Sequence, residues 1–227
     1  MPHTLRTSPP SPAAKPLGRL FRARSHVVSN RAEPAGVIGP NAVIQLVEAI
    51  SAAGMANVLA PVFTAAGQPT WLSEPPARMT DERPVGMLHR LLRAALPPDQ
   101  AECLLEDAGR RTADYLLAHR IPPLAQMLLR HVPPRLAATL LVQAIRRHAW
   151  TFTGSGVFQA QAGRVTVLTL TGNPLCTGES AGRPVCVWHA AVFRRLFTVL
   201  VAPAVRVAET QCQAAGGRCC QFMIDLP

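Results

Sequence analysis

Residues 204–226, AVRVAETQCQAAGGRCCQFMIDL, form the segment of this chain with the clearest fold signal. Apolar and β-favouring residues recur through 204–211 and again through 219–226, whereas 214–217 reads Ala-Ala-Gly-Gly. Two such runs around a short glycine-containing turn are typical of a β-hairpin. The segment therefore predicts two antiparallel strands near the end of the chain.

A second hairpin is predicted upstream of the first. Residues 151–161 and 164–171 are rich in β-favouring residues and flank Ala162-Gly163. Between the two hairpins lie a Gly/Pro-rich loop, 172–184, and a stretch from about 185 to 201 with the apolar spacing of a helix. An antiparallel sheet of two hairpins, with the intervening helix packed against it, is an α+β arrangement.

The first half of the chain is predicted to be helical. Proline pairs precede three amphipathic stretches, because proline is well tolerated at the first position of a helix. Helices are predicted between Pro40 and Gly54 and over 56–66, 84–96, 99–119, 122–132 and 134–149, with a loop over 67–82. We expect a single ligand-binding domain over 36–227, composed of a helical half, 36–149, and a second half, 150–227.

Residues 1–35 are rich in proline and arginine and are predicted to be a disordered tail. The net charge of the chain is +10, and six basic residues precede the first acidic residue, Glu33. More than half of the excess charge therefore lies in the tail. The remaining sequence has no basic stripe interleaved with aromatic residues, so we expect no nucleic-acid partner.

The sequence contains no apolar stretch of the ~18 to 20 residues that a transmembrane helix requires. Its N-terminus also lacks the apolar region of a secretory signal. We therefore expect a cytoplasmic protein whose six cysteines are reduced thiols.

Four cysteines in the last third, Cys176, Cys186, Cys212 and Cys220, are candidate metal ligands. They lie at the ends of predicted elements, where four thiolates can form the tetrahedral site that zinc prefers. Strand alternation assigns Cys220 to the apolar face and Cys219 to the wetter one, so Cys220 is the expected ligand of that pair. The spacing is not the paired C-x2-C pattern, and unligated buried thiols or redox-sensing thiols remain open alternatives.

Two histidines are candidate ligand residues. His189 lies three residues after Cys186, on the same helical face, and begins an apolar stripe. His148 ends a similar stripe beside Trp150. Either imidazole could coordinate the magnesium of a tetrapyrrole, and His189 could instead complete a zinc site. A hydrogen-bonded imidazole at a helix end is the alternative for both.

Glu209 is an isolated carboxylate in an otherwise apolar strand. Burial of an unpaired carboxylate is costly, so we expect an ion pair with Arg206 or Arg218.

No motif for a reductant is present in the sequence. Gly154-Ser155-Gly156 is followed by β-favouring residues rather than by a helix, which excludes a dinucleotide-binding fingerprint. The cysteine spacings also fit no iron–sulfur pattern.

Several of these segments resemble known families. His148-Ala149-Trp150-Thr151-Phe152, Gly154-Ser155-Gly156 and Asn173-Pro174-Leu175-Cys176 resemble the bacteriochlorophyll biosynthesis J family. The closing run 207–212, the Gly216-Gly217 pair and Cys220-Gln221-Phe222 resemble the broader 4-vinyl-reductase domain family. The resemblance extends over about 36–227.

The resemblance implies a mixed fold related to the vesicle-tethering TRAPP subunits, with a pocket for a hydrophobic ligand. It also implies either reduction of a tetrapyrrole vinyl group or transport of a tetrapyrrole that assists magnesium chelation. The family's closing-motif cysteines correspond to Cys186, Cys212 and Cys220, and Cys219 has no counterpart.

The residues favour the carrier over the reductase, because a reductase needs a hydride or electron source. A flat macrocycle needs an apolar cavity, one axial ligand and a few cationic groups. The candidate residues for a magnesium porphyrin or protochlorophyllide-type ligand are Arg147, His148, Trp150, Trp188 and His189, with Arg146 nearby. Expected partners are the tetrapyrrole, magnesium chelatase or other pathway enzymes, and a second copy of the chain. An assembly adaptor without pigment is the third alternative, and enzymatic activity is left open.

Overall fold

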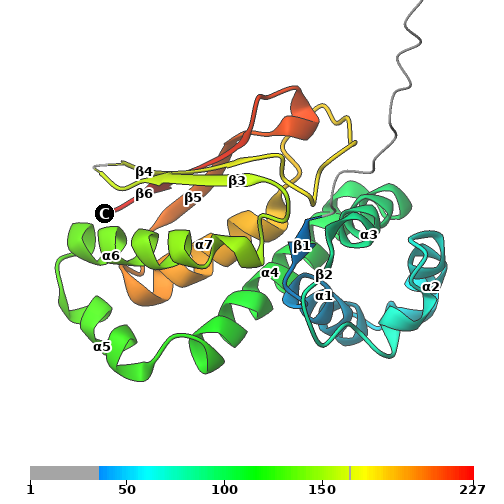
Figure 1. Ribbon diagram of the computed structural model, residues 1–227, viewed down its shortest axis with the longest axis horizontal. Helices are drawn as coiled ribbons and strands as arrows, with labels where there is room; N and C mark the ends of the chain where they lie inside the picture. Colours follow the sequence, from blue (N-terminus) through cyan, green and yellow to red (C-terminus); the bar gives the residue numbers. More distant parts are fainter. Residues whose placement is uncertain (1–35, 164) are drawn as a thin grey trace, which may run out of the picture. The chain divides into compact units, whose positions relative to one another are not determined.

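The computed structural model describes residues 36–163 and 165–227 (Figure 1). The predicted disordered tail, residues 1–35, lies outside the described residues. In the described part, no helix is both long enough and apolar enough to cross a membrane.

A four-stranded antiparallel sheet contains both predicted hairpins. Its strands are β3 (Val157–Gln161), β4 (Val165–Thr171), β5 (Arg206–Gln211) and β6 (Cys220–Asp225), in the order β3-β4-β6-β5. The hairpins join through β4 and β6, where Leu170 pairs with Cys220. The expected α+β architecture is thereby confirmed.

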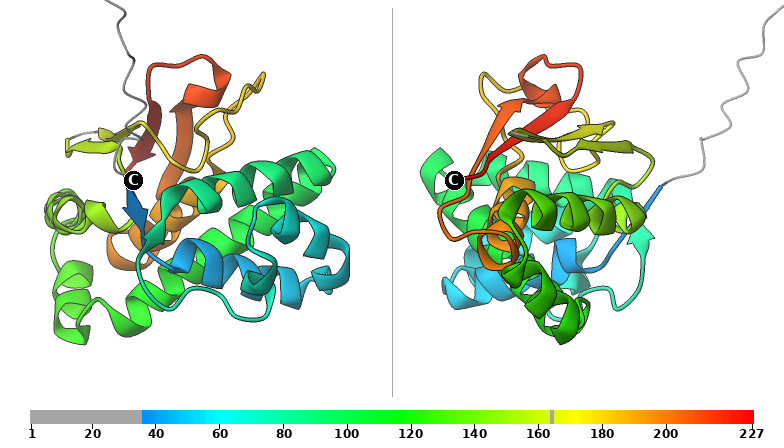
Figure 2. Two further views of the ribbon diagram at one scale, coloured as in Figure 1. Left: turned by 45° about the vertical axis from the view of Figure 1, so that its right-hand side comes forward. Right: turned by 90° about the vertical axis from the view of Figure 1, so that its left-hand side faces the viewer.

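Helix α7 (Val187–Leu200) packs against one face of the sheet (Figures 1 and 2). Nine of its residues are buried, which is typical of a helix that is apolar on nearly all sides. Its C-terminal half contributes Phe193, Leu196 and Phe197 to the core, opposite Phe222 of the sheet. The helix therefore connects the sheet to the helical half of the chain.

Six helices make up the first half of the described chain: α1 (Asn41–Ala52), α2 (Ala56–Ala65), α3 (Glu82–Ala95), α4 (Pro98–His119), α5 (Pro123–His131) and α6 (Pro134–Arg147). In each proline pair, the first proline has extended backbone angles and the second begins the helix. This follows from proline chemistry, since a proline disfavours helical angles in the residue before it but fits the first helical position.

Helix α4 crosses α7 at Gly109. A Cβ atom at this position would lie 2.4 Å from the Trp188 carbonyl oxygen and 2.8 Å from Ala191 Cβ. The absence of a side chain at Gly109 therefore permits the close approach of the two helices.

Several short elements were not predicted. Strand β1 (Val37–Ile38) pairs with β2 (Thr80–Asp81), and a 3-10 turn, η1 (Pro69–Leu72), lies in the expected loop. A second 3-10 turn, η2 (Ala149–Thr151), delays the start of β3 to residue 157. In η2 the Thr151 hydroxyl donates to the His148 carbonyl at 2.7 Å, so local bonds override the β preference of this stretch.

Candidate functional site

Four cysteines from separate parts of the chain meet at one end of the sheet. Cys176 lies in the loop after β4, Cys186 precedes α7, Cys212 follows β5, and Cys220 begins β6. All four are buried, and their sulfur atoms lie within 4.8 Å of one another. The expected convergence is thus present in the structure.

The sulfur separations fit a tetrahedral metal. Cys220 Sγ lies 3.4 Å from Cys186 Sγ, 3.5 Å from Cys176 Sγ and 4.0 Å from Cys212 Sγ. The Cys186 and Cys212 sulfurs are 3.7 Å apart. A zinc–thiolate bond of ~2.3 Å gives a tetrahedral edge of about 3.8 Å, within this range. The residues can therefore hold zinc without rearrangement of the backbone.

Asn173 supports the cluster from its interior side. Its side-chain amide donates to Cys186 Sγ at 3.1 Å and to Cys220 Sγ at 3.5 Å. Its carbonyl oxygen Oδ1 accepts from the Leu175 N–H at 3.1 Å, which fixes the orientation of the amide. This geometry explains the Asn-Pro-Leu-Cys segment, because the asparagine both shapes the loop and orients the sulfurs.

The four thiols differ in acidity because they hydrogen-bond to one another. Thiol donors, Cys176 first and then Cys186 and Cys220, lower the pKa of Cys212 well below its usual value. The hydrogen bond with Cys176 raises the pKa of Cys186, and burial adds to the increase. The arrangement thus favours a negative charge on Cys212, which suits a cation at the centre of the cluster.

The expected ion pair of Glu209 with Arg206 or Arg218 is wrong. Glu209 Oε2 accepts instead from the Cys186 backbone N–H at 2.8 Å, while Oε1 is buried without a partner among the described residues. Arg206 is three residues away on the same strand and therefore faces the opposite side. Burial raises the pKa of Glu209 to about 8, with a further contribution from its hydrogen bond with Cys212.

A buried aromatic cluster surrounds His189 at the start of α7. The His189 ring centroid lies 4.9 Å from that of Trp188, 6.2 Å from that of Phe152 and 6.1 Å from that of Phe222. Phe193 is 6.3 Å away. His189 is 1% exposed, and neither ring nitrogen has a hydrogen-bond partner in the described structure. Burial lowers its pKa to about 3, so the ring is neutral near pH 7.

His89 on α3 joins this cluster and was not predicted from the sequence. Its Nε2 lies 3.1 Å from the Ala42 carbonyl oxygen, and Nδ1 has no partner in the described structure. Its ring lies edge-to-face with Trp188 at 6.2 Å, and Trp188 Nε1 also lacks a described partner. The apolar spacing of Val85, Leu88 and Leu92 could have identified His89, because that spacing puts it on the buried face.

The remaining predicted ligand residues lie elsewhere. Arg147, His148 and Trp150 are exposed around the end of α6, whereas Trp188 and His189 are buried together in α7. His148 Nδ1 lies 2.9 Å from the Ala144 carbonyl oxygen, as a hydrogen-bonded imidazole at a helix end would. The structure therefore brings together two of the five candidates.

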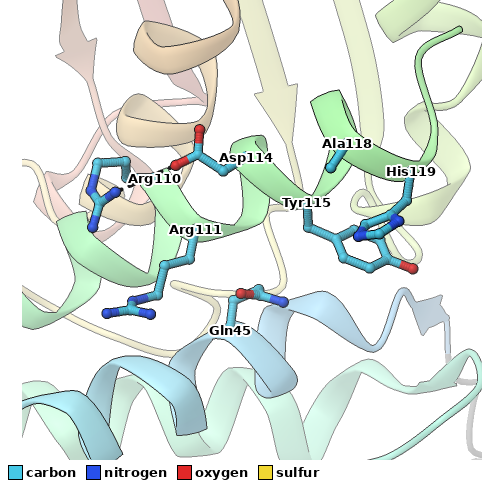
Figure 3. Close-up of a pocket in the computed structure, with 7 residues that line it drawn as sticks. All are labelled: Gln45, Arg110, Arg111, Asp114, Tyr115, Ala118 and His119. Carbon is cyan, nitrogen blue, oxygen red and sulfur yellow. Dashed lines mark hydrogen bonds and ion pairs between the residues drawn. The ribbon is translucent and has the colours of Figure 1, made fainter.

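A separate groove lies between α1 and α4 (Figure 3) and has a volume of about 390 Å³. Its lining residues are Gln45, Arg110, Arg111, Asp114, Tyr115, Ala118 and His119. Arg110 pairs with Asp107 and Asp114, and Arg111 pairs with Asp107, so the cations are neutralised within the groove. It contains neither the cysteines nor His189.

Comparisons with known proteins place the chain among related sequences and folds. A family model of the 4-vinyl-reductase domain matches residues 166–226. The bacteriochlorophyll synthase 23 kDa chain of Cereibacter sphaeroides is 46% identical, over 82% of this chain and 88% of that protein. A protein of the same name from Rhodobacter capsulatus is 40% identical, over 82% of this chain and 86% of its own length.

Two solved structures illustrate the fold similarity. One, described as "Probing the function of heme distortion in the H-NOX family", has a TM-score of 0.54 and 9% identity, covering 83% of this chain and 95% of that chain. A trafficking protein particle complex subunit 3 from Naegleria fowleri has a TM-score of 0.45 and 12% identity, covering 64% of this chain and 95% of that chain. These likenesses concern the fold alone.

Proposed function

Because the chain belongs to the family of the bacteriochlorophyll synthase 23 kDa chains, we propose that it binds a tetrapyrrole intermediate of bacteriochlorophyll synthesis and carries it without reducing it. The observation that carries this proposal is His189. Its ring is buried among aromatic side chains, and both nitrogens lack a partner in the described structure.

An unpartnered buried imidazole is costly, since each unsatisfied polar group costs roughly 1–3 kcal/mol. Such a cost is tolerated at sites that have a ligand to bind. Because His189 is neutral near pH 7, one of its ring nitrogens keeps a lone pair that can coordinate the magnesium of a tetrapyrrole.

The surrounding side chains suit a flat aromatic ligand. Trp188, Phe152, Phe193 and Phe222 offer ring faces and edges around His189, and the Trp188 indole N–H is free to donate to a polar substituent. These side chains now fill the space beside His189, so binding of a macrocycle requires some of them to move. Arg147, His148 and Trp150 are proposed to meet the pigment's carboxylate and edge at the protein surface.

Zinc at Cys176, Cys186, Cys212 and Cys220 is proposed as a structural element of this site. When bound there, zinc would link the start of α7 to β5, β6 and the loop after β4. The four thiols themselves fix the end of α7 that presents His189. The cluster thus provides rigidity, whereas the aromatic site provides recognition.

Titration of the purified protein with magnesium protoporphyrin tests the proposal. Binding should shift the pigment's absorption, and His189→Ala should weaken binding by about 10- to 100-fold. His131→Ala is the matched control, because His131 is exposed and its Nδ1 contacts its own helix. If His148→Ala rather than His189→Ala abolishes the shift, the pigment binds at the end of α6 instead.

The reductase alternative makes a different demand. Divinyl protochlorophyllide incubated with the protein and NADPH should keep its vinyl group, because no nucleotide-binding motif is present in the sequence. Steady formation of the ethyl product by protein free of other reductases would overturn the carrier proposal. A pure adaptor would bind a protein partner and leave the pigment spectrum unchanged.

A further inference from the structure

Helices α5 and α6 expose large apolar side chains to solvent. Leu124 is 75% exposed, and Met127 and Leu128 follow it on the same face of α5. On α6, Leu136 and Leu140 are exposed one turn apart, and Trp150 is 59% exposed just beyond the helix. We refer to Leu124, Met127, Leu128, Leu136, Leu140 and Trp150 as the α5–α6 apolar surface.

The helices that carry this surface lie away from α2 and α3 in the domain (Figure 1). Helix α5 buries a single residue, Leu129, and is otherwise held by its neighbours α6 and α7. An amphipathic helix with its apolar face exposed is normally covered by a partner surface. The charge of the segment indicates which partner that is.

The segment around this surface contains basic residues and no acidic ones. From Tyr115 to Gly178 the sequence has no aspartate or glutamate. In the same segment, the exposed and described arginines are Arg120, Arg130, Arg135, Arg146 and Arg147. In the described structure none of these five pairs with a carboxylate, whereas arginines elsewhere do so: Arg83, Arg93, Arg110, Arg111, Arg183, Arg194 and Arg195.

We infer that the α5–α6 apolar surface, with its surrounding arginines, docks the protein on an anionic lipid bilayer. Leucine and methionine side chains would enter the acyl boundary while the arginines contact lipid phosphates. The indole of Trp150 suits the headgroup level, where tryptophan is enriched. This inference concerns attachment to a surface and is independent of the ligand that the domain carries.

A bilayer fits these features better than an acidic protein partner. The apolar residues follow helix faces rather than a concave pocket, and the five arginines are spread from the end of α4 to the end of α6. A protein partner would bring a defined set of carboxylates, whereas a fluid anionic surface can satisfy arginines at any of these positions.

Vesicle sedimentation with the full chain tests the inference. The protein should bind vesicles made of equal parts phosphatidylglycerol and phosphatidylcholine and bind pure phosphatidylcholine vesicles far more weakly. The variant Arg135→Gln/Arg146→Gln should lose about fivefold per arginine, or roughly twenty-fold in total. The variant Leu124→Gln/Leu128→Gln should lose at least about tenfold, because two exposed apolar side chains no longer enter the bilayer.

The matched control is Arg206→Gln/Arg218→Gln. Both residues are exposed arginines without a described carboxylate partner, but they lie on and near β5 and β6 rather than on α5 and α6. Binding by this variant should equal that of the parent protein. If the control loses as much binding as Arg135→Gln/Arg146→Gln, net charge alone explains the attraction and the inference is wrong.

The arginine-rich residues 19–24 provide the competing explanation. The variant Arg19→Gln/Arg22→Gln/Arg24→Gln separates the two, because it leaves α5 and α6 unchanged. Loss of binding in this variant alone, with full binding by the α5–α6 variants, would overturn the inference.

Tryptophan fluorescence gives a second readout. Trp71 and Trp188 are 8% and 5% exposed, so bilayer contact should shift the emission of Trp150 to the blue, and Trp150→Phe should remove the shift. Protein that sediments with vesicles without this shift would contradict the inference.

Discussion

His89 and His189 should make the protein sensitive to mild acid. Burial lowers the pKa of His89 from 6.5 to about 4 and that of His189 to about 3. Between pH 6.5 and about 4 the unfolded chain therefore binds more protons than the folded one, and the unfolding free energy falls as the pH falls. The expected slope is roughly 1 kcal/mol per pH unit for each histidine.

Urea denaturation of the parent protein and of His89→Leu measures this effect. The variant should be less stable at pH 7.5, because it loses the contact with the Ala42 carbonyl, but the difference should narrow as the pH approaches 5. A difference that stays constant over this range would show that His89 is not held neutral in the folded protein.

The vicinal cysteines should behave differently toward zinc. Cys220 is buried within the sulfur cluster, whereas Cys219 is partly exposed and lies outside it. Cys220→Ser should lower the zinc content of the purified protein and reduce the unfolding free energy by more than about 2 kcal/mol. Cys219→Ser is the matched control and should retain the zinc of the parent protein, as measured by elemental analysis. Equal zinc content in both variants would exclude Cys220 as a ligand.

The sequence predicted these cysteines but only part of their surroundings. Strand alternation identified Cys220, because a period of two is a local property of the chain. The roles of Asn173 and Glu209 depend on contacts with Cys186 and Cys220, which are distant in sequence. No local pattern reports such contacts, and the nearest arginines were therefore wrongly expected to pair with Glu209.

Gly109→Ala tests the contact between α4 and α7. Alanine normally stabilises a helix by up to about 1 kcal/mol relative to glycine. Here the added methyl group would meet the Trp188 carbonyl oxygen at 2.4 Å, so a net loss of about 1–3 kcal/mol is expected. Thermal or urea denaturation measures the change.

Gly182→Ala is the control for this substitution. A Cβ atom at Gly182 meets nothing within 4 Å, so its effect should stay within about 0.5 kcal/mol. A stabilised Gly109→Ala protein would mean that α4 and α7 do not cross as closely as described.

The long helices and the hairpins were predictable because their signals are local. Proline pairs mark the starts of α4, α5 and α6, and alternation with glycine turns marks the strands. The pairing of β1 with β2 was not predictable, because each has two residues and they lie more than forty positions apart. The late start of β3 was missed because side-chain bonds in η2 override strand preference.

The whole domain combines two sites with different demands. The sulfur cluster holds the start of α7 against the sheet, and His189 lies three residues after Cys186 on that helix. Disruption of the cluster should therefore weaken the presentation of His189 as well as the fold. The family relationship could be inferred from the sequence, but the burial of His189 with His89 required the assembled domain.

The absorption spectrum of the protein purified from its own host tests the carrier proposal most directly. If the domain carries a tetrapyrrole, the intact protein should show the absorption bands of a bound magnesium tetrapyrrole, and these bands should be strongly reduced in His189→Ala. Colourless parent protein from cells that are making bacteriochlorophyll, or a spectrum unaffected by His189→Ala, would contradict the account.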